Sequence, residues 1–214
     1  MLGIGGGFWL HKGEFSGVLM NVPNKLTISR FVLTLAFLAV VFARPAFYET
    51  VALALFSAAG LTDYFDGKIA RRDHLITNFG ILMDPLADKI MVCSAFIAFV
   101  GLDWVPAWMV VIVVARELAI TGLRLLAASK NLVLAAERFG KHKTISQIVA
   151  IIALLVWHSY PQWGAAGKLF AIPIVWGPWV TWFAPLSLRV AVILTFTSGA
   201  IYLWRNRRLY LVDL

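Results

Sequence analysis

The sequence predicts an all-α integral membrane protein with about six transmembrane helices. Hydrophobic residues make up 61% of its 214 residues, whereas soluble globular proteins contain about 45–50% apolar residues. The mean hydropathy is correspondingly high, at +0.83. Apolar stretches of about 20 residues, the length needed to cross a bilayer, recur along the chain without any strand-like alternation. We therefore expect a helical bundle embedded in a membrane.

Six apolar stretches are the predicted spans. The first ends at Arg44-Pro45, because proline disfavours a helical conformation at the residue before it. In order, the spans cover approximately residues 26–43, 50–69, 79–102, 105–126, 145–157 and 186–204. Residues 1–20 are expected to form a poorly ordered N-terminal extension, residues 21–208 the transmembrane domain and residues 209–214 a C-terminal tail.

The segment Asn21–Phe31 mixes polar and apolar side chains just ahead of the first span. A short N-terminal amphipathic helix lying on the cytoplasmic surface would have this composition. The alternative is that the segment is simply the polar end of the first span.

The distribution of basic residues predicts the orientation of the bundle. Cytoplasmic loops collect Lys and Arg. With six spans and both termini on one side, only Arg44, Lys168 and Arg189 of the 19 basic residues fall on the other side. Both termini are therefore expected to be cytoplasmic. The net charge of +8 is then typical of loops that face an anionic leaflet, and no nucleic-acid partner is expected.

Two pairs of aspartates interrupt the second and third spans. Asp63 and Asp66 are three residues apart and Asp84 and Asp88 are four apart, so each pair lies on one helix face, about one turn apart. An aspartate deep in a bilayer costs about 2.5–3.5 kcal/mol on insertion scales. Four solvated loop charges are the alternative, and Asp73, in the turn after two arginines, fits it well. Because carboxylates without Cys or His favour hard cations, the pairs predict a site for Mg²⁺ or Mn²⁺.

The spacing of these residues resembles the signature of one enzyme family. Eight positions at fixed spacing match the CDP-alcohol phosphatidyltransferases without a departure: Asp63, Asp66, Gly67, Ala70, Arg71, Gly80, Asp84 and Asp88. Three further segments, residues 21–30, 115–130 and 140–147, are similar to the bacterial phosphatidylglycerophosphate synthases, a branch of that family. The likeness runs from about residue 21 to about residue 208.

The resemblance implies a reaction and a set of site residues. In this family a hydroxyl attacks the phosphatidyl phosphorus of CDP-diacylglycerol and CMP leaves, helped by divalent ions, here two Mg²⁺ or Mn²⁺ ions. Asp63, Asp66 and Asp84 are the implied metal ligands, and Asp88 is the implied base, which also touches the second ion. Residues implied to bind the CDP group are Asp63, Gly67, Ala70, Arg71 and Gly80.

A phosphorylated acceptor needs a second cationic site. Arg116 and Arg124 are eight residues apart on the fourth span, about 80° apart around a helix, and Lys141 and Lys143 follow in the next loop. All four resemble basic positions in the phosphatidylglycerophosphate synthases, which implies glycerol 3-phosphate as the acceptor. For the two lysines the alternative is ordinary cytoplasmic loop charge. For Arg116, which follows an apolar run, the alternative is that the adjacent Glu117 pairs with a neighbour.

The resemblance also implies a setting for the protein: the bacterial inner membrane, with several spans, a cytoplasmic active site and a homodimer surrounded by membrane lipid. Small residues that would allow close helix contacts are Ala54, Ser57, Ala58, Gly60 and Gly122. Serine, inositol phosphate or phosphatidylglycerol remain alternative acceptors within the family. Outside it, a membrane prenyltransferase or an ion-coupled transporter would also place acidic residues in spans, although no inverted repeat is visible.

Overall fold

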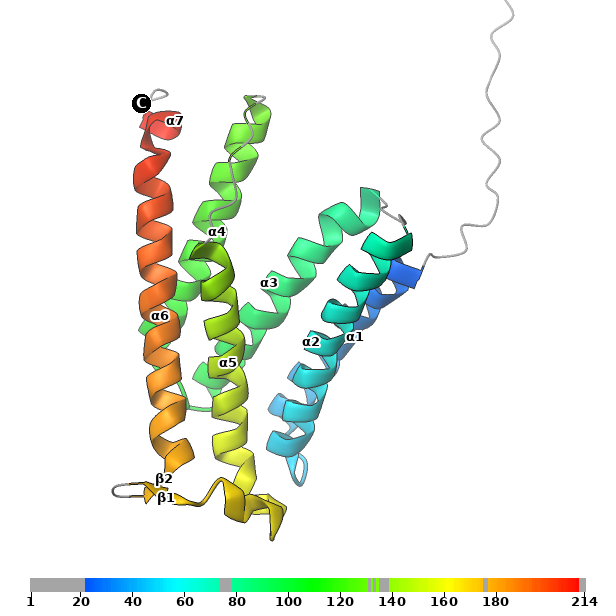
Figure 1. Ribbon diagram of the computed structural model, residues 1–214, viewed down its shortest axis with the longest axis vertical. Helices are drawn as coiled ribbons and strands as arrows, with labels where there is room; N and C mark the ends of the chain where they lie inside the picture. Colours follow the sequence, from blue (N-terminus) through cyan, green and yellow to red (C-terminus); the bar gives the residue numbers. More distant parts are fainter. Residues whose placement is uncertain are drawn as a thin grey trace, which may run out of the picture.

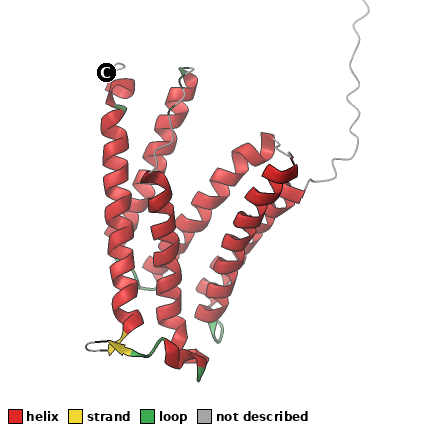
Figure 2. Cartoon of the chain, in the orientation of Figure 1, coloured by secondary structure: helices red, strands yellow, loops and turns green. Residues whose placement is uncertain are grey.

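The computed structural model is an all-helical bundle with a short irregular region at one end (Figure 1). It describes residues 22–73, 78–130, 132, 134, 139–174 and 177–211. The long helices are α1 (Val22–Ala43), α2 (Tyr48–Asp73), α3 (Asn78–Gly101), α4 (Ala107–Ser129), α5 (Phe139–Ser159) and α6 (Trp179–Arg205), followed by the short α7 (Arg207–Leu211). Figure 2 shows how little of the described chain lies outside helices. The predicted all-α class is confirmed.

Two segments of the described chain are long and apolar enough to cross a membrane by length and composition, His142–Trp163 and Trp179–Arg205. They correspond to the fifth and sixth predicted spans. The remaining predicted spans coincide with α1 to α4, of which α2 and α3 carry the aspartates. The predicted N-terminal extension, residues 1–20, lies outside the described residues.

Two predicted boundaries differ from the structure. The expected short amphipathic helix is not a separate element, because α1 continues from Val22 to Ala43. Pro23 lies in its first turn, where its missing N–H has no helical partner to lose. The sixth helix begins at Trp179 rather than near Leu186, and Pro185 lies inside it. Neighbouring helices allow a proline to be accommodated within an apolar helix, so Pro185 is not a boundary.

The core lies between the helices and is built largely from phenylalanine and aliphatic side chains. Phe37 of α1 packs against Phe56 of α2 and Phe99 of α3, with ring centroids 6.0 and 6.5 Å apart. On the other side of the core, Gln147 of α5 donates a hydrogen bond of 2.9 Å to the hydroxyl of Thr195 on α6. Both of these polar side chains are buried, and such bonds help to fix helix pairs in apolar surroundings.

The end of the bundle opposite α7 carries the irregular region. It contains two 3₁₀ helices, η1 (Tyr160–Trp163) and η2 (Ala166–Leu169), and a hairpin of two short strands, β1 (Pro173–Ile174) and β2 (Gly177–Pro178). No pattern in the sequence indicates this hairpin, because strands of two residues are too short to show alternation. Trp163 donates a hydrogen bond of 3.0 Å from Nε1 to Thr50 of α2, and Gln162 donates one of 2.6 Å to Glu49. These contacts tie the irregular region to α2.

Removing one of these contacts should have a measurable effect on stability. Trp163→Phe deletes the indole N–H but keeps a ring beside Phe170, which packs edge-on at 5.2 Å. We expect the free energy of unfolding to fall by about 1 kcal/mol, the usual net value of one hydrogen bond. Thermal unfolding of the protein in detergent measures this. Trp182→Phe is the control, because Trp182 is exposed and its replacement should change stability by less than about 0.5 kcal/mol. Equal shifts for the two variants would contradict the expectation.

Candidate active site

The predicted carboxylates belong to two consecutive helices, α2 and α3. Asp63 and Asp66 belong to the last part of α2, and Asp84 and Asp88 to the first part of α3. This end of the bundle also holds the end of α4, the start of α5 and α7 (Figure 1). The two halves of the aspartate motif are therefore brought to the same end of the bundle as the basic residues around the α4–α5 connection. The side chains of Asp63, Asp66 and Asp84 lie outside the described residues.

Asp88 is held by a buried arginine of α1. Arg30 donates a hydrogen bond of 2.7 Å from Nη1 to Oδ1 of Asp88, and its own side chain is 1% exposed, whereas that of Asp88 is 47% exposed. A fully buried guanidinium is costly unless it is paired. The pair therefore fixes one oxygen of Asp88 toward α1 and leaves the carboxylate accessible from solvent.

The neighbouring residue connects the same part of α3 to α4. Lys89 donates a hydrogen bond from Nζ to the hydroxyl of Thr121, which in turn donates to the carbonyl of Glu117 at 2.7 Å. Consecutive residues of a helix point about 100° apart, so Asp88 faces α1 while Lys89 faces α4. This part of α3 thus lies between α1 and α4.

Glu117 is the centre of a buried ion-pair cluster between α4 and α5. Lys143 donates from Nζ to Oε1 of Glu117, and Arg116 donates to the same oxygen from Nη1 at 3.2 Å. All three side chains are at most 14% exposed. Glu117 therefore pairs with both neighbouring cations, which is the alternative that the sequence left open for Arg116. The cluster holds two positive charges and one negative charge, so it carries a net positive charge in a region where charges are poorly screened.

Arg116 has a further donor that no described residue satisfies. Its Nε is buried and has no hydrogen-bond partner within the part of the chain that the structure describes. A buried unsatisfied donor costs about 1–3 kcal/mol or more when charged, and an anion beside it would remove that cost. Lys143 and Arg116, predicted as acceptor-phosphate residues, therefore lie together in a setting suited to an anion.

The position of Arg116 depends on a glycine of α6. A Cβ atom placed on Gly199 would lie 2.7 Å from Cγ of Arg116, closer than side chains normally approach. One helical turn further along α6, Tyr202 receives a hydrogen bond of 3.4 Å from Nε of Arg124, whose guanidinium lies 5.8 Å from the ring centroid. Both arginines therefore contact α6, but Arg124 is exposed while Arg116 is largely buried.

The remaining predicted site residues are placed only by their helices. Gly67, Ala70 and Arg71 lie in α2, Gly80 in α3, and Lys141 in the first turn of α5, and their surroundings lie outside the described residues. Sequence reasoning did not single out Arg30, which it counted only among the cytoplasmic charges. The sequence did contain a signal, because the polar residues Thr27, Arg30 and Thr34 recur at helical spacing. The structure shows that all three are buried on one face of α1.

An all-helical chain with two helices long and apolar enough to cross a membrane is typical of membrane-associated helical proteins. The comparison with known families makes this specific. The family model for CDP-alcohol phosphatidyltransferases matches residues 20–193. This chain belongs to the CDP-alcohol phosphatidyltransferase family, which agrees with the resemblance of its eight-position signature.

Individual relatives extend over nearly the whole chain. A protein from Bacillus subtilis named CDP-diacylglycerol–glycerol-3-phosphate 3-phosphatidyltransferase is 40% identical over 201 residues, which is 88% of this chain and 96% of the relative. A probable phosphatidylglycerophosphate synthase from Mycobacterium tuberculosis is 35% identical and covers 89% of this chain and 83% of its own length. A Cereibacter sphaeroides protein with the same name as the Bacillus one is 30% identical and covers 90% of this chain and 98% of the relative.

Proposed function

We propose that this protein transfers the phosphatidyl group of CDP-diacylglycerol to sn-glycerol 3-phosphate, giving phosphatidylglycerophosphate and CMP in phospholipid biosynthesis. The observation that carries the proposal is that relatives with 30–40% identity over most of their length are named for this activity. The complete aspartate signature at the α2–α3 end supports it. These relatives favour a transferase over the alternative of an ion-coupled transporter.

In the proposed reaction the acceptor hydroxyl forms a new P–O bond to the phosphatidyl phosphorus while the bond from that phosphorus to the CMP oxygen breaks. Asp88 is proposed to take the hydroxyl proton. Its carboxylate is half exposed and is oriented by Arg30 through Oδ1, so a substrate can reach it without displacing the ion pair. Positioning of this kind is a main contribution of a protein to phosphoryl transfer.

Asp63, Asp66, Asp84 and Asp88 are proposed to hold two Mg²⁺ or Mn²⁺ ions. The donor set fits, because it is made of carboxylate oxygens, the ligands that hard divalent cations prefer. When bound, such ions neutralise charge on the diphosphate and the leaving group. Gly67, Ala70, Arg71 and Gly80, with Asp63, are proposed to form the CDP site; glycines would let the nucleotide approach the backbone, and Arg71 would pair with phosphate.

Arg116, Arg124, Lys141 and Lys143 are proposed to bind the phosphate of the acceptor. The buried Nε of Arg116 and the net positive charge around Glu117 support this assignment for Arg116 and Lys143. Glu117 occupies both cations without substrate, so an acceptor phosphate would compete with this carboxylate for the same donors.

We further propose that α1 to α6 all cross the membrane, with both termini and the active site cytoplasmic. The basic residues at the α7 end and their scarcity at the hairpin end support this orientation. The first turns of α1 would then lie at the cytoplasmic surface. A homodimer in the bacterial inner membrane is the proposed assembly.

An acceptor panel tests the proposed reaction. Purified protein with CDP-diacylglycerol and Mg²⁺ should release CMP and form labelled phosphatidylglycerophosphate from glycerol 3-phosphate, but not form lipid from serine, inositol phosphate or phosphatidylglycerol. Lys143→Met should raise the KM for glycerol 3-phosphate about tenfold or more, since a charged hydrogen bond contributes about 1.5–3 kcal/mol, and leave the KM for CDP-diacylglycerol nearly unchanged.

The control for this variant is Lys168→Met, because Lys168 lies in η2 at the opposite end of the bundle. It should change neither constant. Turnover with serine and none with glycerol 3-phosphate would overturn the choice of acceptor while leaving the phosphatidyl transfer intact.

A further inference from the structure

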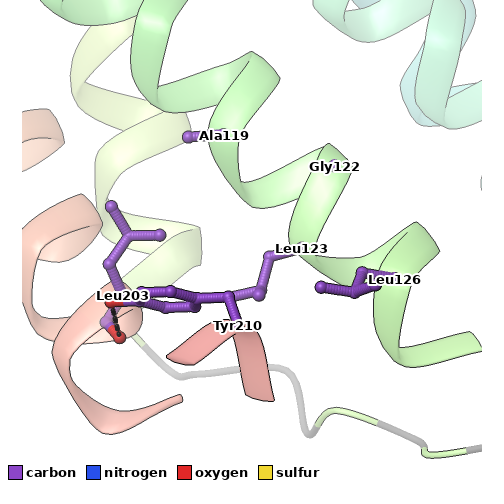
Figure 3. Close-up of a pocket in the computed structure, with 6 residues that line it drawn as sticks. All are labelled: Ala119, Gly122, Leu123, Leu126, Leu203 and Tyr210. Carbon is purple, nitrogen blue, oxygen red and sulfur yellow. Dashed lines mark hydrogen bonds between the residues drawn. The ribbon is translucent and has the colours of Figure 1, made fainter. Parts of the chain in front are cut away.

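An apolar groove runs between α4 and α6 and ends at α7. Its first part has a volume of about 380 Å³ and is lined by Ala119, Gly122, Leu123, Leu126, Leu203 and Tyr210. Figure 3 shows Tyr210 of α7 lying between the two helices, where its hydroxyl donates a hydrogen bond of 3.3 Å to the carbonyl of Leu203. A second part of about 370 Å³ shares Ala119 and Leu203 with the first. The two parts adjoin at these residues, and together we call them the α4–α6 groove.

The groove is space that the chain itself leaves unfilled. A Cβ atom on Gly122 would meet no atom within 4 Å, and Ala119 is exposed. Among the described residues that line it, Arg116 alone is charged, and it lies with Phe196 and Gly199 in the second part. An elongated apolar occupant fits such a lining better than water, because water needs several polar partners.

Positive charge surrounds the α7 end of the groove. Arg207 and Arg208 are exposed, and the guanidinium of Arg207 lies 4.6 Å from the ring centroid of the exposed Trp204. Lys130, at the end of α4, donates a hydrogen bond of 3.3 Å to the carbonyl of Leu209. The described residues of α6 and α7 contain no Asp or Glu. An anionic group at this end would therefore meet several cations and no carboxylate from the described residues of α6 and α7.

We propose that the α4–α6 groove is a binding site for an anionic phospholipid, with one acyl chain in the groove and the headgroup phosphate against Arg207 and Arg208. Apolar walls that lead to a basic and aromatic end match the two parts of such a lipid. The site lies apart from the proposed reaction centre, since the aspartates belong to α2 and α3 whereas the groove belongs to α4, α6 and α7. It goes beyond the proposed function and does not depend on it.

Native mass spectrometry tests lipid binding in the groove. The full chain is incubated with phosphatidylglycerol or phosphatidylcholine and released from detergent before the bound lipids are counted. The unchanged protein should retain one phosphatidylglycerol per chain and less phosphatidylcholine. Gly122→Phe should abolish this retention by filling the groove, and Ala119→Leu should weaken it. Gly60→Phe is the matched control, because a Cβ on this glycine of α2 also meets no atom within 4 Å; it should retain the lipid. Thermal unfolding checks that each variant is folded.

The headgroup contact is tested separately. Arg207→Gln and Arg208→Gln should each reduce the preference for phosphatidylglycerol over phosphatidylcholine about fivefold, the value of one basic residue near an anionic lipid. Arg189→Gln, which removes an exposed charge of α6 far from α7, should not. Equal retention of both lipids by the unchanged protein, or full retention by folded Gly122→Phe, would overturn the proposal. The proposal would also be overturned if Gly122→Phe left the number of bound lipids unchanged but converted dimers into monomers. That result would mean that a second copy of the chain covers the groove.

Discussion

Replacing Asp66 by asparagine should lower the rate of CMP release by at least about a hundredfold. The change keeps the shape of the side chain but removes a carboxylate charge from the proposed metal site. Mutation of residues that only orient metal ligands already lowers metal affinity or activity about 10–100-fold. The measurement is CMP release with CDP-diacylglycerol and glycerol 3-phosphate across a range of Mg²⁺ concentrations. The loss should be partly restored at high Mg²⁺, because a weakened site needs more metal to fill.

The control is Asp73→Asn at the last residue of α2. Asp73 lies outside the eight-position signature, so this variant should keep the activity and the Mg²⁺ dependence of the unchanged protein. Removal of divalent ions by a chelator should stop the reaction, and Mg²⁺ or Mn²⁺ should restore it. Full turnover by Asp66→Asn, or full turnover in the chelator, would remove the basis for the metal site.

Replacing Arg30 by methionine should lower both stability and activity. Methionine fills much of the buried volume, but Asp88 loses the guanidinium that lies 2.7 Å from its Oδ1. Breaking a fully buried pair costs about 3–5 kcal/mol; because Asp88 is half exposed and water can solvate it, we expect a loss of about 2 kcal/mol in the free energy of unfolding. We also expect kcat to fall about tenfold or more, as is usual when a group that orients a site residue is removed.

A double-mutant cycle separates the ion pair from the packing. Arg30→Met, Asp88→Asn and the combination of both should show a coupling energy of about 1–3 kcal/mol in thermal or denaturant unfolding. Arg44→Met serves as the control, because Arg44 is exposed and only donates a long hydrogen bond of 3.3 Å to the carbonyl of Gly101. If the changes for Arg30 and Asp88 simply add, the pair does not position Asp88 as we describe.

The sequence was sufficient to predict the helices because each apolar span is a local property of about 20 residues. Predictions from local sequence were wrong, or were not made, where packing against other segments decides the secondary structure. The sixth span was expected from about Leu186, yet α6 begins at Trp179 and passes through Pro185, because packed neighbours can accommodate a proline. The hairpin of β1 and β2 depends on pairing between strands too short to leave a pattern.

The candidate site could be predicted only in part for a related reason. The aspartate pattern is defined by spacing within one stretch of sequence, and the pairing of Glu117 with Arg116 joins adjacent residues. The partner of Asp88 is 58 residues away, on a helix that the aspartate pattern does not include. Likewise, the dependence of Arg116 on Gly199 joins α4 to α6. Such contacts follow from how helices pack, which hydropathy and spacing do not specify.

The close approach of Gly199 to Arg116 has a consequence for how this protein can change over time. A larger residue at position 199 would push the guanidinium away from α6, so a chain with alanine or serine there needs a shorter or differently directed side chain at position 116. The two positions should therefore vary together among related enzymes. A set of homologous sequences in which bulky residues at 199 coexist freely with arginine at 116 would argue against this constraint.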